Sequence, residues 1–235
     1  MSDMPTHLGK YAIVREIGHG GFSTVYQAHD PDHDRMVALK VLAPHLLRDA
    51  AFAARFRAEF ETVVRLHHPN IVSVYEYGEI DGQPYIAMEY VPGVTLEQVL
   101  EQTDGPLPLL RVLHLVEGLA AALTHALRRG VVHRDVKPQN IIVQARDQVK
   151  LADFGIAKVT ARTFQTTTGR IFGSPEYMSP EQAQGEDLDH RSDVYSLGVV
   201  LYEMITGQVP FASDTPLSVM LSHCEQAPPP PTAHN

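Results

Sequence analysis

Short runs of alternating apolar and polar residues fill the first ninety positions of the chain. These runs are rich in β-branched and aromatic residues, and Gly, Asp and Pro residues separate them. Such a pattern is typical of strands joined by turns, so we predict a small antiparallel sheet. The predicted strands are YAIVREI, STVYQAH, MVALKVL, IVSVYEYG and PYIAMEYV.

One helix is predicted to interrupt this sheet. Between positions 52 and 64, apolar residues recur at spacings of four, four, three and one, which place them on one face of a helix. Glu59 lies on this predicted helix. The apolar positions are Phe52, Phe56, Phe60, Val63 and Val64.

Longer apolar segments in the second half of the chain predict a mainly helical region. Residues 109–129 are apolar on nearly every face, as expected of a helix buried in a larger helical body. Residues 193–207 predict a second buried helix, with Asp193 as its amino-terminal cap and Gly207 as its end.

These patterns predict an α+β fold with two lobes. Residues 1–90 form the smaller lobe, with the antiparallel sheet and one helix. Residues 91–227 form the larger, mainly helical lobe, and the proline-rich residues 228–235 form an extended tail.

Composition narrows the classes of function. The 235 residues include 28 Asp and Glu against 19 Lys and Arg, and a net charge of −9 argues against a nucleic-acid-binding protein. The single cysteine, Cys224, excludes an internal disulfide framework and favours a reducing, cytoplasmic setting. We find no signal peptide and no uncharged apolar run of membrane-spanning length, so we expect no membrane segment in this chain.

A glycine-rich turn and a strand-end lysine are the first candidate phosphate ligands. Gly18 and Gly20 lie between two predicted strands, where missing side chains would let backbone amides approach an anion. Lys40 ends a predicted strand, and pairing with Glu59 would hold its ammonium group in place for phosphate oxygens. Taken singly, these features more often belong to a surface hairpin turn and a solvated lysine than to a phosphate site.

Charged and amide side chains are concentrated in the segment HRDVKPQN, residues 133–140, between two apolar runs. Together with LADFG at 151–155, this segment provides Asp135, Asn140 and Asp153. Hard oxygen ligands of this kind suit Mg²⁺.

In this order, the motifs resemble those of the eukaryotic-type, or Hanks-type, protein kinases. They are Gly-x-Gly, Val-Ala-x-Lys, His-Arg-Asp with an Asn five residues after the Asp, Asp-Phe-Gly and Ser-Pro-Glu, within about residues 10–226. Lys137, two residues after Asp135, is similar to the serine/threonine branch, and GSPEYMSPEQ resembles the bacterial enzymes. The resemblance implies a two-lobed kinase fold and transfer of the ATP γ-phosphate to Ser or Thr hydroxyls of proteins.

The resemblance implies roles for the loop residues. Asp135 would accept the proton of the substrate hydroxyl and orient it, and Lys137 would neutralise charge on the transferring group. Asn140, which also belongs to the catalytic loop, and Asp153 would hold Mg²⁺.

The resemblance also assigns the ATP-binding residues. Lys40 would contact the α- and β-phosphates, and Glu59 would hold Lys40 in place. The other positions implied to contact ATP are Gly18, Gly20, Gly21, Phe22, Val25, Ala38, Met88, Glu89, Val91 and Ile142.

Regulation is predicted around Arg134. A phosphate on a nearby threonine would pair with this arginine and order the loop, with a second copy of the chain as a partner for trans-autophosphorylation. The alternative is that the threonines are polar residues without such a role. By the same resemblance, His133 would pack against Phe154 and have a structural role. The candidate threonines are Thr166, Thr167 and Thr168.

Two alternatives to an active protein kinase stay open at this point. The last helices of the larger lobe in this family are not found after about residue 226, so we expect a truncated lobe in which Glu181 lacks its usual arginine partner. Such a chain would act as a noncatalytic ATP-binding or scaffolding module. A small-molecule phosphotransferase would share the fold, but the Thr-rich segment and GSPEYMSPE resemble peptide-docking elements instead.

Overall fold

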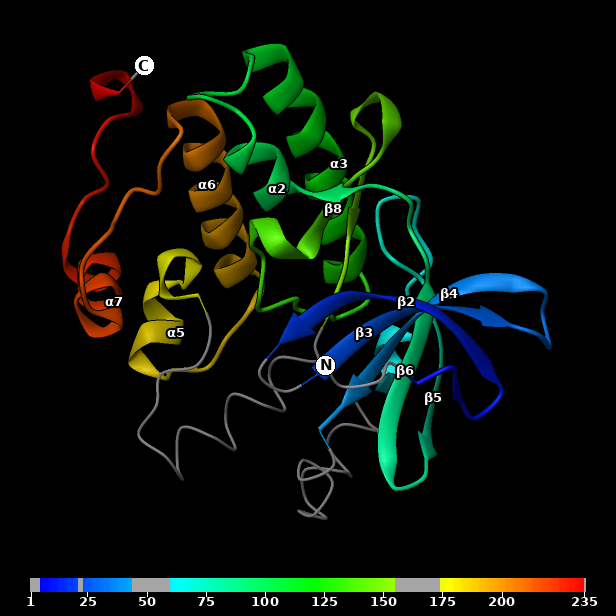
Figure 1. Ribbon diagram of the computed structural model, residues 1–235. Helices are drawn as coiled ribbons and strands as arrows, with labels where there is room; N and C mark the ends of the chain where they lie inside the picture. The colour runs from blue at the N-terminus through cyan, green and yellow to red at the C-terminus, as the bar shows by residue number, and fades with distance from the viewer. Residues whose placement is uncertain (1–4, 21–22, 44–59, 155–173, 235) are drawn as a thin grey trace. The chain divides into compact units, whose positions relative to one another are not determined.

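The computed structural model describes residues 5–20, 23–43, 60–154 and 174–234 (Figure 1). The chain divides into two units. The first unit comprises residues 1–67 and 72–92, and the second comprises residues 68–71 and 93–235.

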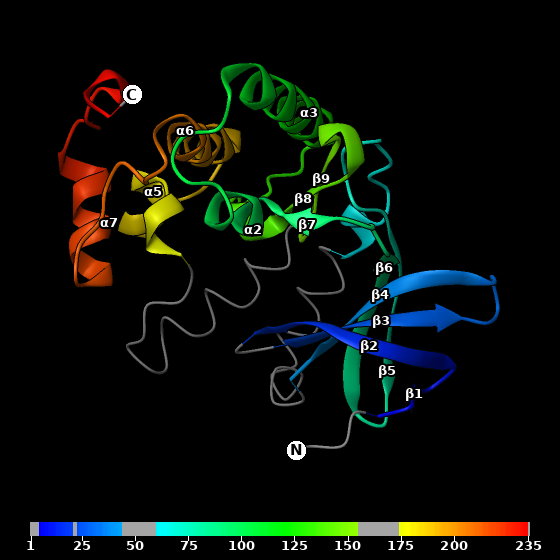
Figure 2. The same cartoon turned by 45° about the horizontal axis from the view of Figure 1, so that its top comes forward.

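Six antiparallel strands form the sheet of the first unit (Figures 1 and 2), in the order β1-β2-β3-β4-β6-β5. The predicted antiparallel sheet is therefore confirmed, and the two-residue strand β1 adds to it. The strands are β1 (His7–Leu8), β2 (Tyr11–Gly20), β3 (Ser23–Asp30), β4 (Arg35–Leu42), β5 (Val74–Ile80) and β6 (Gln83–Glu89).

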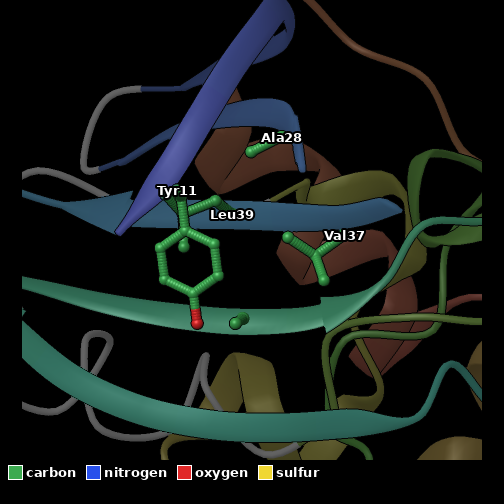
Figure 3. Packing of buried hydrophobic residues seen from close by; sticks show 5 residues of the cluster. Tyr11, Ala28, Val37 and Leu39 are labelled. Atoms are coloured by element: carbon green, nitrogen blue, oxygen red, sulfur yellow. The ribbon is translucent and has the colours of Figure 1, made fainter. Parts of the chain in front are cut away.

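Alternation along the strands separates a core face from an opposite face. Val37 and Leu39 are two residues apart on β4, so their side chains leave the sheet on the same side. They join a cluster of side chains that are at most 1 % exposed, four of which are labelled in Figure 3. The cluster consists of Tyr11, Ala28, Val37, Leu39 and Ala87.

A buried carboxylate lies at the end of β3. Asp30 is 1 % exposed, and its oxygens accept hydrogen bonds from His33 Nδ1 at 2.9 Å, Arg35 Nε at 3.2 Å and the Asp32 main-chain N–H at 3.2 Å. Lys10 Nζ lies 3.8 Å from Asp30 Oδ1. Burial acts to raise the pKa of Asp30, but these donors and cations outweigh it and hold the pKa below its usual value.

Part of the predicted helix lies in the described residues. Residues 60–63 are helical, and the Phe60 ring lies 5.7 Å from the Tyr77 ring of β5. This contact is consistent with an apolar helix face packed on the sheet. The earlier part of the predicted helix, Glu59 included, lies outside the described residues.

Helices dominate the second unit, as predicted. They are α2 (Leu96–Glu101), α3 (Leu109–Leu127), α5 (Pro180–Gln184), α6 (His190–Thr206) and α7 (Pro216–Glu225). A small antiparallel sheet joins β7 (Val94–Thr95), β8 (Ile141–Val143) and β9 (Val149–Leu151). Short 3-10 turns lie at η2 (Pro138–Asn140), η3 (Ala145–Asp147), η4 (Pro175–Tyr177) and η5 (Pro231–Ala233).

One face of α3 is buried, not nearly every face. The prediction of an all-round buried helix is wrong, because Leu110 is 83 % exposed and three other leucines of α3 are exposed with it. The buried residues are Val112, Leu115, Leu119, Ala122 and Ala126, at the spacing of an amphipathic helix. Within the described residues, α3 alone has the length and apolar composition that a membrane span requires.

The backbone of α3 approaches β9 closely at Gly118. A β-carbon at this glycine would lie 2.5 Å from Val149 Cγ2 and 3.0 Å from Asn70 Nδ2. Glycine is therefore required at this helix position by close packing. In contrast, a β-carbon at Gly198 of α6 would meet no atom within 4 Å.

The predicted cap of α6 is wrong, and its predicted end is confirmed. Asp189 caps the helix, with its carboxylate accepting a hydrogen bond from the Arg191 main-chain N–H at 2.8 Å. Asp193 lies one turn inside the helix. Gly207 follows the last turn with a φ of 79°, a left-handed conformation that favours glycine.

A four-residue segment, residues 68–71, belongs to the second unit although the chain on both sides of it belongs to the first. Asn70 Nδ2 donates to the Val149 carbonyl at 2.8 Å, and the Asn70 carbonyl accepts from the Leu151 main-chain N–H at 2.8 Å. Ile71 forms an isolated bridge with Leu151. These contacts attach the segment to β9.

Candidate active site

Three predicted catalytic residues lie together in the second unit. Asn140 Nδ2 donates to Asp135 Oδ2 at 2.9 Å and to the Asp135 carbonyl at 2.8 Å. Lys137 Nζ also lies 2.9 Å from Asp135 Oδ2. Both side-chain donors therefore contact one carboxylate oxygen. In the described part of the chain, Asp135 Oδ1 receives no hydrogen bond, so this oxygen is available as an acceptor.

The backbone before Asp135 is held by a carboxylate of α6. Asp193, which is 4 % exposed, accepts the main-chain N–H groups of His133 and Arg134, each at 2.7 Å. Arg134 has a φ of 70°, a conformation that costs free energy for a residue with a side chain. Two hydrogen bonds to a buried carboxylate, together with one from Gln182 Nε2 to the Arg134 carbonyl at 2.8 Å, stabilise this turn.

His133 has the structural position that was predicted for it. Its side chain is fully buried, and its ring lies edge-on to the Phe154 ring with centroids 4.4 Å apart. Nε2 is within 2.8 Å of the Ala152 carbonyl, and Nδ1 accepts the Asp135 main-chain N–H at 3.2 Å. With both ring nitrogens bonded to the backbone, one neutral tautomer satisfies both bonds, and the ring orients Asp135.

Asn140 and Asp153 are brought to the same end of the β8–β9 pair. Asn140 immediately precedes β8, Asp153 follows β9 by two residues, and Ile141 pairs with Leu151. The Ala152 main-chain N–H donates to the Asn140 carbonyl at 2.8 Å. An amide oxygen and a carboxylate suit Mg²⁺, which takes one or two carboxylates and otherwise phosphate and water oxygens. The described residues contain no group of three or more His, Cys, Asp or Glu side chains able to hold a metal.

Four predicted ATP-binding residues share one face of the sheet in the first unit. Lys40 is paired with Val25 of β3, and Ala38 is paired with Met88 of β6. Ala38 and Lys40 are two residues apart on β4, so all four side chains lie on the same face. This face is opposite to the one that carries Leu39 and its cluster.

Neither predicted phosphate-loop glycine in the described residues is required by local packing. Gly18 pairs with Val25, and Gly20 pairs with Ser23 at the end of the β2–β3 hairpin. A β-carbon at either glycine would make only ordinary contacts, at 3.7 Å. Neither glycine has a positive φ. The geometry of the hairpin would therefore accept residues with side chains at both positions.

Three further residues predicted to contact ATP, Glu89, Val91 and Ile142, differ in their surroundings. The Glu89 main-chain N–H donates to the Ser73 carbonyl at 2.8 Å, so this donor is already used within the first unit. Val91 is buried. Ile142 lies in the second unit, on β8, where it pairs with Thr95 and Lys150.

Six predicted residues lie outside the described residues, and for them the assignments stay predictions. They are Gly21, Phe22, Glu59, Thr166, Thr167 and Thr168.

Glu181 has a partner that the sequence did not indicate. Ser192 Oγ donates a hydrogen bond to Glu181 Oε1. Burial acts to raise the pKa of Glu181, but hydrogen bonds from Ser192, from its own main-chain N–H and from Ser179 outweigh it and lower the pKa. The carboxylate is thus compensated by groups of α5 and α6.

Two site features were missed by sequence reasoning, namely the role of Asp193 and the bond from Gln182 to Arg134. The sequence did offer a signal for the role of Asp193, because Asp189, four residues earlier, is itself a good amino-terminal cap. Starting the helix at Asp189 would have left Asp193 as a buried carboxylate in need of donors.

Comparisons with known proteins agree with these motifs. A model of the protein kinase domain family matches residues 11–230. The serine/threonine-protein kinase PknB of Mycobacterium leprae is 45% identical over 234 residues, which cover 97% of this chain and 38% of that protein. The serine/threonine-protein kinase pkn3 of Myxococcus xanthus is 46% identical over 232 residues, which cover 95% of this chain and 42% of that protein. The chain thus spans less than half the length of these curated relatives.

The solved structures agree with the fold as well. A crystal structure of the Mycobacterium tuberculosis PknI kinase domain superposes with a TM-score of 0.77 at 34% identity, covering 97% of this chain and 82% of that chain. The predicted α+β kinase-like fold is therefore confirmed. Because the family model matches nearly the whole chain and the relatives are serine/threonine kinases of bacteria, the chain belongs to the protein kinase family, in its bacterial Hanks-type serine/threonine branch.

Proposed function

We propose that this chain acts as a serine/threonine protein kinase, transferring the γ-phosphate of ATP to Ser or Thr hydroxyls of proteins. The observation that carries the proposal is the arrangement around Asp135, in which Lys137 and Asn140 both contact Oδ2. A carboxylate held in this way presents its second oxygen to a hydroxyl in a fixed orientation.

The acceptor hydroxyl would bind to Asp135 Oδ1. As the hydroxyl oxygen bonds to the γ-phosphorus, its proton passes to this carboxylate and the bond from phosphorus to the β–γ bridging oxygen breaks, leaving ADP. Lys137, whose side chain is 17 % exposed beside Asp135, would stabilise negative charge on the transferring phosphoryl group. Positioning and electrostatic stabilisation provide most of the rate enhancement in such reactions.

Asn140 and Asp153 would hold Mg²⁺, and Lys40 would bind the α- and β-phosphates. When bound, Mg²⁺ neutralises phosphate charge and orients the triphosphate. The side chains of Val25 and Ala38 would contact adenine, since they are apolar and share the sheet face with Lys40.

Protein substrates are the expected partners. We further propose that phosphorylation of Thr166, Thr167 or Thr168 activates the enzyme through Arg134, that a second copy of the chain performs it, and that the enzyme works in the cytoplasm. The reasoning is electrostatic, because a phosphate close to a guanidinium forms charge-assisted hydrogen bonds that order a loop.

Intact-mass analysis and phosphosite mapping after incubation with Mg²⁺ and ATP test the proposal. We expect added phosphate in the parent chain and none in Asp135→Asn. The matched control is Asp214→Asn, which removes an exposed carboxylate from the same unit and should retain transfer. A folded, ATP-binding parent chain that transfers nothing to itself or to a generic protein substrate would contradict kinase activity and support the noncatalytic module.

A further inference from the structure

A buried histidine lies where α7 meets α6 and the turn η4. His223 is on α7, which Figures 1 and 2 show beside α5, and its ring contacts Tyr195 of α6. The side chain is 4 % exposed. Its ring lies edge-on to the Phe211 ring at 4.9 Å and to the Tyr195 ring at 5.6 Å. Because the side chain is buried, each ring nitrogen needs a hydrogen-bond partner.

One ring nitrogen has a strong partner on α6. Tyr195 Oη lies 2.7 Å from His223 Nδ1. A neutral imidazole carries one donor and one acceptor, so if the phenol hydroxyl donates to Nδ1, the ring proton lies on Nε2.

The other ring nitrogen faces the backbone of η4. Nε2 is buried and forms no hydrogen bond of good geometry with any described residue. The backbones of Pro175 and Glu176 lie close enough to raise the pKa of His223. Proline has no N–H, so the group that Pro175 offers is a carbonyl, which suits an Nε2–H donor.

The turn η4 is bonded to α6 at other points. Ser196 Oγ donates to the Tyr177 carbonyl at 2.8 Å, and Tyr177 Oη donates to Glu203 Oε2 at 2.8 Å. These bonds hold the carboxyl-terminal end of η4. His223 faces its beginning, so the histidine and α6 together enclose the turn.

Several titratable groups surround His223. Tyr195 on α6 and Glu176 on η4 lie next to its ring, and Glu181 on α5 and Cys224 on α7 act in turn on Tyr195. Burial lowers the pKa of His223, and the backbone of η4 and the Glu176 carboxylate offset this only in part. The imidazole is thus neutral in the folded protein at pH 7. Below the ordinary histidine pKa of about 6.5, protonation works against the packed arrangement.

We propose that His223, bonded to Tyr195, is a positioning residue that holds residues 174–177 in the conformation that accepts a protein substrate. This inference rests on the proposed kinase function and on the resemblance of GSPEYMSPE, which includes residues 174–177, to peptide-docking elements. It assigns a role to a side chain that touches neither ATP nor the reacting hydroxyl. Its consequence is that substrate affinity, and not the phosphoryl-transfer step, depends on the protonation of one buried residue.

Steady-state kinetics with a protein substrate test the inference. Tyr195→Phe keeps the ring and removes one hydrogen bond, and we expect the KM for protein substrate to rise about fivefold, with kcat and the KM for ATP unchanged. In the parent, this KM should rise as the pH falls from 7.5 to 5.5. In His223→Gln, which cannot titrate, the same KM should be independent of pH. The control His114→Gln, an exposed histidine of α3, should behave as the parent.

Hydrogen–deuterium exchange separates this inference from the proposed function. Amides of residues 176–178 should exchange faster in Tyr195→Phe than in the parent, while amides of α3 stay unchanged. If the parent transfers no phosphate, the kinase function fails, and faster exchange in the variant would still support the positioning role. Equal exchange in parent and variant, or the same pH dependence of KM in His223→Gln and the parent, would overturn it.

Discussion

The carboxylate of Asp193 accepts the main-chain N–H of Arg134 at 2.7 Å, although 59 residues separate the two in the chain. The same carboxylate accepts the His133 N–H. The long helix α6 thus fixes the backbone that leads directly into Asp135. The position of the Asp135 carboxylate therefore depends on Asp193, which contacts only the backbone before it.

Replacing Asp193 by Asn should lower both stability and catalysis. Asn offers one acceptor oxygen in place of two and places an amide donor against a main-chain N–H, so we expect a loss of about 2 kcal/mol in the free energy of unfolding. The resulting shift of Asp135 should lower kcat about 100-fold. Urea denaturation and steady-state kinetics measure the two effects. Asp189→Asn, which changes only the exposed cap of the same helix, should retain activity, and an active Asp193→Asn would show that this anchor is dispensable.

Replacing Lys137 by Met should lower kcat without altering ATP binding. The ammonium group lies 2.9 Å from Asp135 Oδ2 and would act on charge that develops during transfer. We expect kcat to fall about 100-fold to 1000-fold, as for removal of one charge-stabilising donor, with an unchanged KM for ATP. Kinetics at saturating protein substrate measure this. A raised KM for ATP with normal kcat would instead place Lys137 in nucleotide binding.

Replacing Asp30 by Asn should reduce the acid sensitivity of the first unit. Because the folded state lowers the Asp30 pKa, its contribution to stability is complete above the unfolded value of about 3.9 and is lost as the pH falls through the folded pKa. At pH 7 the variant should be less stable by about 2 kcal/mol. Its stability should depend less on pH between about 5 and 2 than that of the parent.

Chemical denaturation across this pH range measures the effect. The control is Asp34→Asn, whose side chain is 96 % exposed and should leave the pH dependence as it is in the parent. Parallel pH curves for Asp30→Asn and the parent would contradict a lowered Asp30 pKa.

Alanine at two helix glycines should have opposite effects. Gly118→Ala places a methyl group 2.5 Å from Val149 Cγ2, so we expect a loss of about 1 to 3 kcal/mol in the free energy of unfolding. Gly198→Ala meets open space and should gain up to about 1 kcal/mol from helix propensity. Thermal unfolding of both variants measures the difference. A stabilised Gly118→Ala would mean that α3 and β9 adjust at little cost.

Local patterns predicted those parts of the fold that depend on nearest neighbours. Period-two alternation located the strands of the first unit, and the same alternation puts Lys40 and Ala38 on one face and Leu39 on the other. The end of α6 at Gly207 follows from the freedom of glycine to adopt a positive φ. Such features need no knowledge of distant parts of the chain.

Features that depend on distant partners were not predicted. Asp193 resembles a helix cap in sequence. Its actual role, accepting the main-chain N–H groups of residues 133 and 134, depends on a part of the chain about 60 residues earlier. Similarly, the composition of α3 does not reveal which leucines remain exposed, because the neighbours that cover a helix are set by tertiary structure. The partner of Glu181 is Ser192, on the next helix, which no motif indicates.

The segment formed by residues 68–71 also affects the order in which the protein can be assembled during synthesis. The partner of Asn70 on β9 follows it by 79 residues. At the usual translation rates, about 4 to 16 s pass between the appearance of the two on the ribosome. Until β9 has been synthesised, Asn70 and Ile71 have no strand to bond. The sheet of the first unit can therefore form early, whereas residues 68–71 become ordered only when β9 of the second unit is present.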